Sequence, residues 1–206
     1  MSEVFPILYS FRRCPYAMRA RMGMVRQDYN VEHREVVLRD RPPQMMKISP
    51  KGTVPVLLLQ DGTVIEESLE IMQHILSWTP NEEESHWIER NDGEFKVHLD
   101  RYKYPNRYDN VDHLVHRTAA SAYLMDLNQR LSEGPAFASA LDDALFPFVR
   151  QFANHDRAWF DAQPWEDVHQ WLTVHLESEV FKRCMKKYKQ WVEGDDMVVF
   201  PPIDEP

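Results

Sequence analysis

Over the first eighty positions of this 206-residue chain, short apolar runs alternate with segments in which apolar residues recur at helical spacing. The apolar or β-branched runs predict strands at Val4–Tyr9, Val31–Leu38, Val54–Leu59 and Thr63–Ile65. Helical spacing predicts helices at Pro15–Tyr29, Gln44–Ile48 and Glu67–Trp78. The order β-α-β-α-β-β-α is typical of a small mixed sheet with helices on its faces.

Beyond residue 80 the pattern changes to helices alone. They are predicted at His86–Arg101, Asn110–Leu131, from Ser139 through Phe152, at Trp165–Leu176 and at Glu179–Trp191. The tail Asp195–Pro206 shows no period and is expected to be irregular. We therefore predict an α/β domain at residues 1–78, a polar linker at residues 79–85 and an all-helical domain at residues 86–206.

The distribution of charge changes at the same place. Residues 1–80 hold ten Lys and Arg against nine Asp and Glu, whereas residues 81–206 hold fourteen against twenty-four. An acidic second half disfavours a nucleic acid partner, because such partners bind to basic surfaces. Four basic residues gather around Cys14, and this cluster suits a small anionic ligand: Arg12, Arg13, Arg19 and Arg21.

Cysteine and hydropathy patterns suggest a reducing, aqueous compartment. The longest apolar run, Val54–Leu59, is too short to cross a bilayer, so no membrane association is expected. The amino-terminal residues lack the apolar stretch and cleavage site of a signal peptide. The two cysteines, Cys14 and Cys184, lie far apart and do not resemble a disulfide framework, so we expect a cytoplasmic protein.

Cys14 has the sequence context of a reactive thiolate. It follows Arg12 and Arg13 and precedes Pro15, a residue suited to the first turn of a helix. Cys14 is therefore predicted to be the N-cap, with its sulfur facing the N–H groups of the first helical turn. Cysteines in such positions have pKa values of roughly 3.5–7.5, against about 8.5 for an ordinary cysteine. The alternative is a buried and inert cysteine.

Histidine spacing gives little support for a metal site. His113 and His116 are the one close pair, among nine histidines, that suggests metal binding. No cysteine or third ligand accompanies them at a recognisable spacing, so we expect no bound metal.

Three motifs together resemble the cytosolic glutathione transferases over nearly the entire chain. They are the stretch from Tyr9 to Ala17 with Cys14-Pro15, the segment Gly52-Thr53-Val54-Pro55-Val56-Leu57, and Glu66-Glu67-Ser68. The stretch from Ala144 to Phe152 is similar to that of bacterial members. The run Cys14-Pro15-Tyr16-Ala17 is most similar to the omega-like, glutaredoxin-related branch, which uses cysteine where other classes use tyrosine or serine.

This resemblance implies a thioredoxin-like first domain, a helical second domain and a set of glutathione contacts. Cys14 would be the catalytic residue, supported by Arg13, Pro15 and Tyr16. Val54 would precede a cis Pro55 and pair through its backbone with the cysteinyl part of glutathione. Ser68 and Glu67 would bind the γ-glutamyl carboxylate and ammonium. Arg41, or in second place Lys51, would meet the glycyl carboxylate. Aromatic side chains of the second half would wall the acceptor pocket: Tyr102, Tyr104, Tyr108 and Tyr123.

The implied chemistry is that of a monothiol transferase with glutathione as co-substrate. Cys14 would form a mixed disulfide with glutathione during thiol transfer, dehydroascorbate reduction or deglutathionylation of a small adduct. Ala17 stands where a dithiol enzyme would have its resolving cysteine, and Cys184 lies in the other predicted domain. Conjugation of glutathione to small electrophiles is the alternative enzyme activity. A non-catalytic relative that binds a protein partner is the third reading. The family also implies a homodimer.

Overall fold

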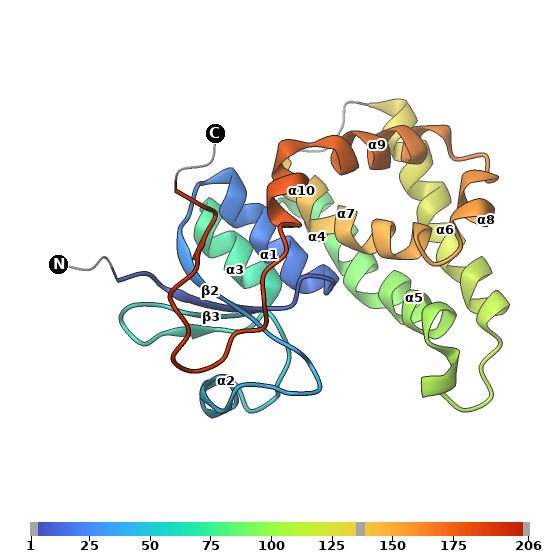
Figure 1. Ribbon diagram of the computed structural model, residues 1–206. Helices are drawn as coiled ribbons and strands as arrows, with labels where there is room; N and C mark the ends of the chain where they lie inside the picture. Colours follow the sequence, from blue (N-terminus) through green and yellow to red (C-terminus); the bar gives the residue numbers. More distant parts are fainter. Residues whose placement is uncertain (1–3, 135–138, 204–206) are drawn as a thin grey trace. The chain divides into compact units, whose positions relative to one another are not determined.

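The computed structural model describes residues 4–134 and 139–203 (Figure 1). The chain divides into two compact units. The first contains the residues up to Thr79 together with those from Ser178 onward, and the second contains Pro80–Glu177. The sequence-based division assigned residues 178–206 to the helical domain instead, because the chain continues there in helical periodicity before it turns irregular.

The first unit is built on one five-stranded mixed sheet. Its strands are β1 (Ile7–Ser10), β2 (Val31–Glu35), β3 (Val56–Leu58), β4 (Val64–Ile65) and β5 (Val199–Phe200). The spatial order is β4-β3-β1-β2-β5, in which β1 and β2 are parallel and the other three pairs are antiparallel. The first seven elements follow the order β-α-β-α-β-β-α, which confirms the predicted thioredoxin-like fold of the first domain.

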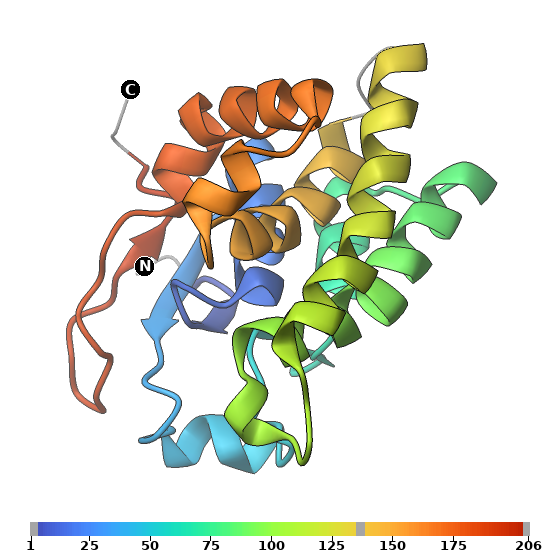
Figure 2. The ribbon, with the colours of Figure 1, turned by 90° about the vertical axis from the view of Figure 1, so that its right-hand side faces the viewer.

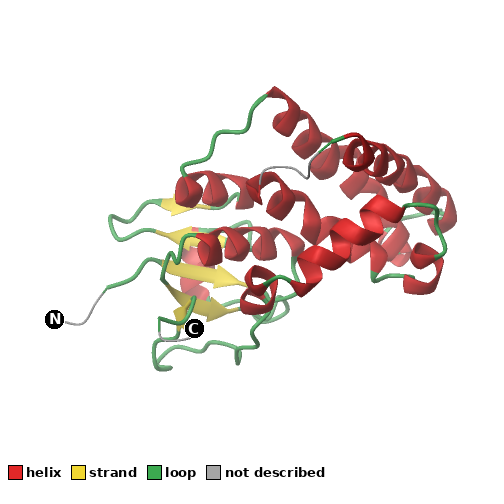
Figure 3. Ribbon diagram, turned by 90° about the horizontal axis from the view of Figure 1, so that it is seen from above, coloured by secondary structure: helices red, strands yellow, loops and turns green. Residues whose placement is uncertain are grey.

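Three helices of the first unit accompany this sheet: α1 (Pro15–Arg26), α2 (Pro43–Ile48) and α3 (Ser68–Leu76). Helices α1 and α3 pack against each other on one face, while α2 lies on the opposite side of the strands (Figures 1 and 3). Successive strand residues point to opposite faces. Leu8 and Leu57 accordingly join a core with Met24 of α1. Their neighbours Tyr9 and Val56 join a second core with Met45 of α2.

Local sequence explains where several of these elements begin and end. Pro15 occupies the first turn of α1, where its ring presets φ and its missing N–H leaves no partner unsatisfied. Asp61 and Gly62 make the turn between β3 and β4, in which Gly62 has a φ of +90°. The side chain of Asp61 also accepts a hydrogen bond from the backbone N–H of Thr63 at 2.9 Å. This turn is the one that the sequence predicts.

The carboxyl-terminal segment differs from the prediction. Helix α10 covers only Glu179–Cys184, and the chain then runs without regular structure to β5. β5 pairs with β2, and Phe200 is fully buried in the first core. The backbone of Trp191 also donates to the carbonyl oxygen of Glu35 at 2.9 Å. A two-residue strand has no detectable period, so its partner strand, rather than its own sequence pattern, defines it.

The second unit is helical. It contains α4 (Glu82–Arg90), a π-helical turn (Asn91–Phe95), α5 (Lys96–Lys103), a 3₁₀ turn (Pro105–Arg107), α6 (His113–Glu133), α7 (Ser139–Ala153), α8 (Arg157–Asp161) and α9 (Glu166–Glu177). Figure 2 shows α5 and α6 side by side. The core of the helical unit includes Phe95 stacked on Tyr123, with 4.5 Å between ring centroids, and Tyr102 packed against Phe152 at 5.3 Å. No helix within the described ranges has the length and hydropathy that a membrane span requires.

The segment predicted as a linker contains the first turn of α4. Asn81 is the N-cap, and its side chain accepts from the backbone N–H of Glu84 at 3.0 Å. The Glu84 carboxylate accepts in return from the backbone N–H of Asn81 at 2.8 Å. This reciprocal capping box satisfies two backbone donors that would otherwise lack partners. The glutamates at 82–84 therefore belong to a helix start, where negative charge is favourable.

Candidate active site at the start of the first helix

Cys14 is the N-cap of α1, as predicted from Pro15. The chain leaves β1 at Ser10 and makes a turn at residues 11–14, which the backbone N–H of Cys14 closes by donating to the carbonyl oxygen of Phe11 at 3.0 Å. The thiol is half-buried and forms no disulfide. The amino-terminal end of a helix carries a positive partial charge, which favours an anion at this position.

The sulfur points toward the segment before β3. Its Sγ atom donates to the carbonyl oxygen of Val54 at 3.6 Å and makes no capping hydrogen bond with the first turn of α1. The Val54–Pro55 peptide is cis, which confirms the expectation drawn from the family resemblance. Cys14 and the backbone of Val54 are therefore direct neighbours, although forty positions separate them in the sequence.

Glu67 and Ser68 stand at the start of α3, with Glu67 as the N-cap. The Glu67 carboxylate pairs with the ammonium of Lys51 at 2.6 Å, and both side chains are well exposed. This hydrogen bond raises the pKa of Lys51; burial opposes it, and the charges of the neighbouring glutamates add to it. Ser68 is buried, and its hydroxyl accepts from Nη1 of Arg19 at 3.4 Å. Lys51 and Glu67, which were expected to bind opposite ends of glutathione, thus form an ion pair with each other.

Arg41 belongs to the same neighbourhood. Its Nε atom donates to the carbonyl oxygen of Gly52 at 2.6 Å. Gly52 has a φ of +64° and ends a turn that begins at Ser49. Since Gly52 lies between Lys51 and the Val54–Pro55 peptide, the contacts of Arg41, Lys51 and Val54 belong to one short stretch of chain.

The side chains expected to support Cys14, together with the nearby Tyr9, mainly contact their own neighbours in the first unit. Arg13 is exposed, and its guanidinium lies 5.7 Å from the centroid of Phe11. Tyr16 is half-buried, with the Arg19 guanidinium 5.7 Å from its ring centroid. Tyr9 is buried, and its hydroxyl accepts a hydrogen bond from Nη1 of Arg34 at 2.7 Å. Burial raises the pKa of Tyr9, and the nearby Arg34 opposes that effect.

Two of the four arginines expected to attract an anionic ligand are instead inside the first unit. Arg19 and Arg21 are 0% and 1% exposed. Arg21 donates from Nη2 to the carbonyl oxygen of Arg12 at 2.7 Å and from Nε to that of Cys184 at 3.1 Å. Glu35 accepts from the backbone N–H of Arg12 at 2.7 Å. Sequence reasoning missed Glu35. The available signal was the strand alternation, which places Glu35 on the same buried face of β2 as Val31 and His33.

The aromatic and histidine candidates of the second unit also have structural roles. Tyr102 and Tyr123 are core residues, while Tyr104 and Tyr108 flank the 3₁₀ turn. His116 faces His98, with their Nδ1 atoms 2.7 Å apart. The described residues contain no group of three or more histidine, cysteine or carboxylate side chains arranged to hold a metal ion.

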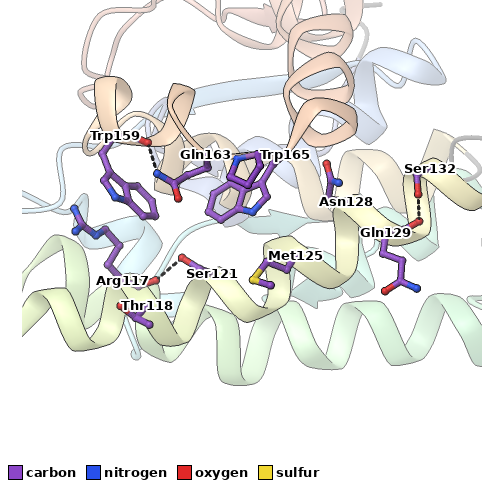
Figure 4. A pocket seen from close by; sticks show the side chains of 11 residues that line it. Arg117, Thr118, Ser121, Met125, Asn128, Gln129, Ser132, Trp159, Gln163 and Trp165 are labelled. Atoms are coloured by element: carbon purple, nitrogen blue, oxygen red, sulfur yellow. Dashed lines mark hydrogen bonds between the residues drawn. The ribbon is translucent and has the colours of Figure 1, made fainter.

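A groove of about 710 Å³ lies within the helical unit (Figure 4). Two indoles, Trp159 and Trp165, face α6 across it, and the Arg117 guanidinium lies 4.2 Å from the ring centroid of Trp159. Amide and thioether side chains complete the wall, among them Gln163, Asn128 and Met125. None of the expected glutathione contacts lines this groove.

Sequence comparison covers only part of the chain. Residues 8–84 match the sequence model of the glutathione S-transferase N-terminal domain. The chain is 30% identical over 69 residues to glutathione S-transferase U22 of Arabidopsis thaliana, which is 34% of this chain and 32% of that protein. It is 30% identical over 83 residues to a probable maleylacetoacetate isomerase of Caenorhabditis elegans, which is 39% of this chain and 38% of that protein. The two matches thus span 32% and 38% of the relatives' own lengths.

Structural comparison covers most of the chain. A glutathione transferase family member from Pseudomonas fluorescens, solved with two glutathione molecules bound, superposes with a TM-score of 0.75 at 14% identity. That superposition covers 88% of this chain and 92% of the other. Glutathione transferase Omega 3C from Trametes versicolor gives a TM-score of 0.73 at 18% identity, over 91% and 87% of the two chains. Residues 8–84 are thus similar in sequence to a glutathione S-transferase N-terminal domain, and the chain is similar in fold to solved glutathione transferases.

Proposed function

We propose that this protein is a glutathione-dependent thiol transferase in which Cys14 is the nucleophile. One observation carries the proposal: the sulfur lies at the amino-terminal end of α1 and 3.6 Å from the backbone of Val54, next to the cis Pro55. A thiol at a helix start is the setting in which cysteine ionises most readily. The motif Cys14-Pro15-Tyr16-Ala17 favours the cysteine-type, omega-like branch of the superfamily.

Glutathione would bind along the neighbouring stretch of the first unit. In this arrangement the backbone of Val54 pairs with the cysteinyl part of the tripeptide. Ser68 and Glu67, at the start of α3, bind the γ-glutamyl end, since a helix start attracts a carboxylate and Glu67 attracts an ammonium group. Lys51 and Arg41 face the glycyl carboxylate. On binding, the Lys51–Glu67 ion pair would separate or remain in contact, with Lys51 at the glycyl carboxylate and Glu67 at the ammonium group of the ligand.

The reaction takes place in two thiol–disulfide exchanges. The Cys14 thiolate attacks the glutathione sulfur of a mixed disulfide; a Cys14–glutathione disulfide forms, and the substrate thiolate leaves and takes up a proton. A second glutathione, as thiolate, attacks the glutathione sulfur of that adduct. Oxidised glutathione leaves, and the Cys14 thiolate is restored. The reductant is the second, free glutathione, whose thiol is oxidised to the disulfide while the substrate sulfur is reduced to a thiol, so no further reductant is needed.

This exchange is expected to be monothiol. Ala17 occupies the position, one helical turn after Cys14, where a resolving cysteine would stand. Cys184 belongs to the first unit after all, which corrects the prediction that it lies in the other domain. It is nevertheless fully buried, and its thiol donates to the carbonyl oxygen of Met18 at 3.6 Å. A buried thiol behaves as a small apolar side chain, so Cys184 is a poor candidate for resolution.

The proposal extends to the setting of the reaction. The acceptors we expect are small disulfides, dehydroascorbate or small glutathione adducts, in a reducing cytoplasm where thiols persist. A homodimer is expected from the family resemblance, and sedimentation would distinguish it from a monomer.

Mass spectrometry of the intact protein tests the assignment of the nucleophile. After exposure to oxidised glutathione, the wild-type protein should gain one glutathione, and a further addition of reduced glutathione should remove it. Cys14→Ser should gain none. Cys184→Ala is the matched control, because it removes the other thiol and should leave the adduct unchanged.

Three results would contradict the proposal. An adduct that persists in Cys14→Ser and disappears in Cys184→Ala would assign the reactive thiol to α10. A conjugating transferase would be supported if the wild-type protein forms no glutathione adduct and if Cys14→Ser conjugates glutathione to 1-chloro-2,4-dinitrobenzene as fast as the wild type does. Absence of both activities in the folded wild-type protein would support a binding role.

A further inference from the structure

The backbone of Arg12, in the turn between β1 and Cys14, forms hydrogen bonds with two buried side chains of opposite charge. The backbone N–H of Arg12 donates to Oε1 of Glu35 at 2.7 Å. Its carbonyl oxygen accepts from Nη2 of Arg21 at 2.7 Å. Glu35 is 8% exposed and Arg21 1%. We call this pair of side chains, Glu35 and Arg21, the clamp.

The clamp is itself fixed to the rest of the first unit. Arg21 projects from α1, two helical turns after Cys14, and also donates to the hydroxyl of Ser10 and to the carbonyl oxygens of Phe11 and Cys184. Glu35 ends β2, and its second carboxylate oxygen lies 3.2 Å from Nε2 of the buried His33. Hydrogen bonds that involve ionised groups are shorter and stronger than neutral ones. The clamp is therefore a rigid contact rather than a surface interaction.

The clamped residue lies inside the turn that places the proposed nucleophile. This turn covers residues 11–14 and is closed by the N–H of Cys14, which donates to the carbonyl oxygen of Phe11 at 3.0 Å. The same carbonyl accepts from Arg21 at 3.4 Å. Any shift of Arg12 relative to β2 and α1 would consequently move Cys14 relative to the helix start and to Val54.

We propose that Glu35 and Arg21 are positioning residues for Cys14, an inference that rests on the proposed function of that thiol. They act through the backbone of Arg12, and hold the turn so that Cys14 lies at the end of α1. Reactions of this kind are sensitive to position, since a displacement of about 1 Å can lower a rate by roughly 10²-fold.

Two substitutions of Glu35 separate the reach of the side chain from its charge. Glu35→Asp keeps the charge but withdraws the carboxylate from Arg12 by one methylene group. Glu35→Gln removes the charge but leaves an oxygen that can accept from the Arg12 N–H. Glu32→Gln is the control, because Glu32 lies on the same strand and pairs with Arg34 instead of the turn.

The readouts are kcat and KM for glutathione in the thiol transferase assay, the pH inflection of Cys14 alkylation, and thermal unfolding. We expect Glu35→Asp to lower kcat by at least tenfold, with KM changed less than threefold, and to shift the alkylation inflection toward that of a free cysteine. Glu35→Gln should stay within about threefold of the wild-type kcat, and Glu32→Gln within twofold. Arg21→Lys, which keeps the charge but loses the planar fork, should behave like Glu35→Asp.

The inference is overturned if folded Glu35→Asp and Arg21→Lys proteins keep the wild-type kcat and alkylation inflection and lose only thermal stability. It is also overturned if Glu35→Gln loses as much as Glu35→Asp, because the electrostatic field of the carboxylate, rather than its hydrogen bond to the Arg12 N–H, would then control Cys14. Failure of the proposed function has a different signature: no turnover that depends on Cys14 in the wild type. The alkylation inflection of Cys14 still reports on the clamp in that case.

Discussion

The sulfur of Cys14 donates to the carbonyl oxygen of Val54 across 3.6 Å. This contact belongs to the protonated thiol, since a thiolate has no hydrogen to donate and would be repelled by the carbonyl oxygen. We therefore expect ionisation to turn the sulfur away from Val54 and toward the positive end of α1. The backbone of Val54 would then be available to glutathione. One side-chain rotation would thus link ionisation of the nucleophile to opening of the ligand position.

Placement of a second thiol one turn after Cys14 should change the chemistry from monothiol to dithiol. In Ala17→Cys the two sulfurs lie on the same side of the helix start, within reach of each other. We expect the glutathione adduct to be replaced by an internal disulfide after exposure to oxidised glutathione, as measured by intact mass. The control is Ala20→Cys, which is also buried but lies two turns from Cys14. A stable adduct on Ala17→Cys would contradict the expected geometry.

Loss of the charge at Glu67 should weaken glutathione binding. A hydrogen bond to a charged group contributes about 1.5–3 kcal/mol, so Glu67→Gln should raise the KM for glutathione about tenfold or more, with kcat nearly unchanged. The exposed Lys51–Glu67 pair itself contributes about 0–1 kcal/mol to stability, so the unfolding temperature should hardly move. Steady-state kinetics at varied glutathione concentration measures the effect. Glu70→Gln, on the same helix and exposed, is the control, and an equal rise in its KM would refute a specific role for Glu67.

The carboxyl-terminal strand should contribute strongly to the stability of the first unit. Phe200 is fully buried against Leu8 and Val31, so Phe200→Ala should lower the free energy of unfolding by about 3–5 kcal/mol. Denaturant unfolding measures the change. Ile203→Ala, in the same tail but 60% exposed, should change it by less than about 0.5 kcal/mol. Similar losses in both variants would mean that the tail acts as a whole and not through the buried ring.

The sequence predicted the main elements of the first unit because their apolar periods are clear and their boundaries carry turn residues. The carboxyl-terminal strand could not be predicted, since two residues without a period become a strand only by pairing with β2. Arg19 and Arg21 were interpreted as ligand-facing because charged side chains are seldom buried. Only the three-dimensional position of the Arg12 carbonyl and the Ser68 hydroxyl explains where these two guanidinium groups lie.

The buried His33 should make the protein less stable in mild acid. Burial lowers the pKa of His33. The hydrogen bond in which the Glu35 carboxylate accepts opposes this effect, and the charge of Arg21 lowers the pKa further. Because the folded pKa lies below the unfolded one, the unfolded chain binds the extra proton as the pH falls below about 6.5. Stability contributed by neutral His33 is thus present above pH 6.5 and is lost toward the lower, folded pKa.

His33→Gln should remove this part of the pH dependence. The slope of unfolding free energy below pH 6.5 should decrease by at most about 1.4 kcal/mol per pH unit, the value for one proton. Urea unfolding between pH 5 and pH 8 measures the slope. His86→Gln is the control, since His86 is exposed. A slope that does not change in His33→Gln would show that other groups cause the acid sensitivity.

The central claim is that Cys14 reacts as a thiolate at neutral pH, and the rate of its alkylation by iodoacetamide against pH tests it most directly. The measurement uses Cys184→Ala, in which Cys14 is the one remaining cysteine of the 206-residue sequence. We predict an inflection at least one pH unit below the value of about 8.5 for a free cysteine. An inflection at or above that value would contradict the account.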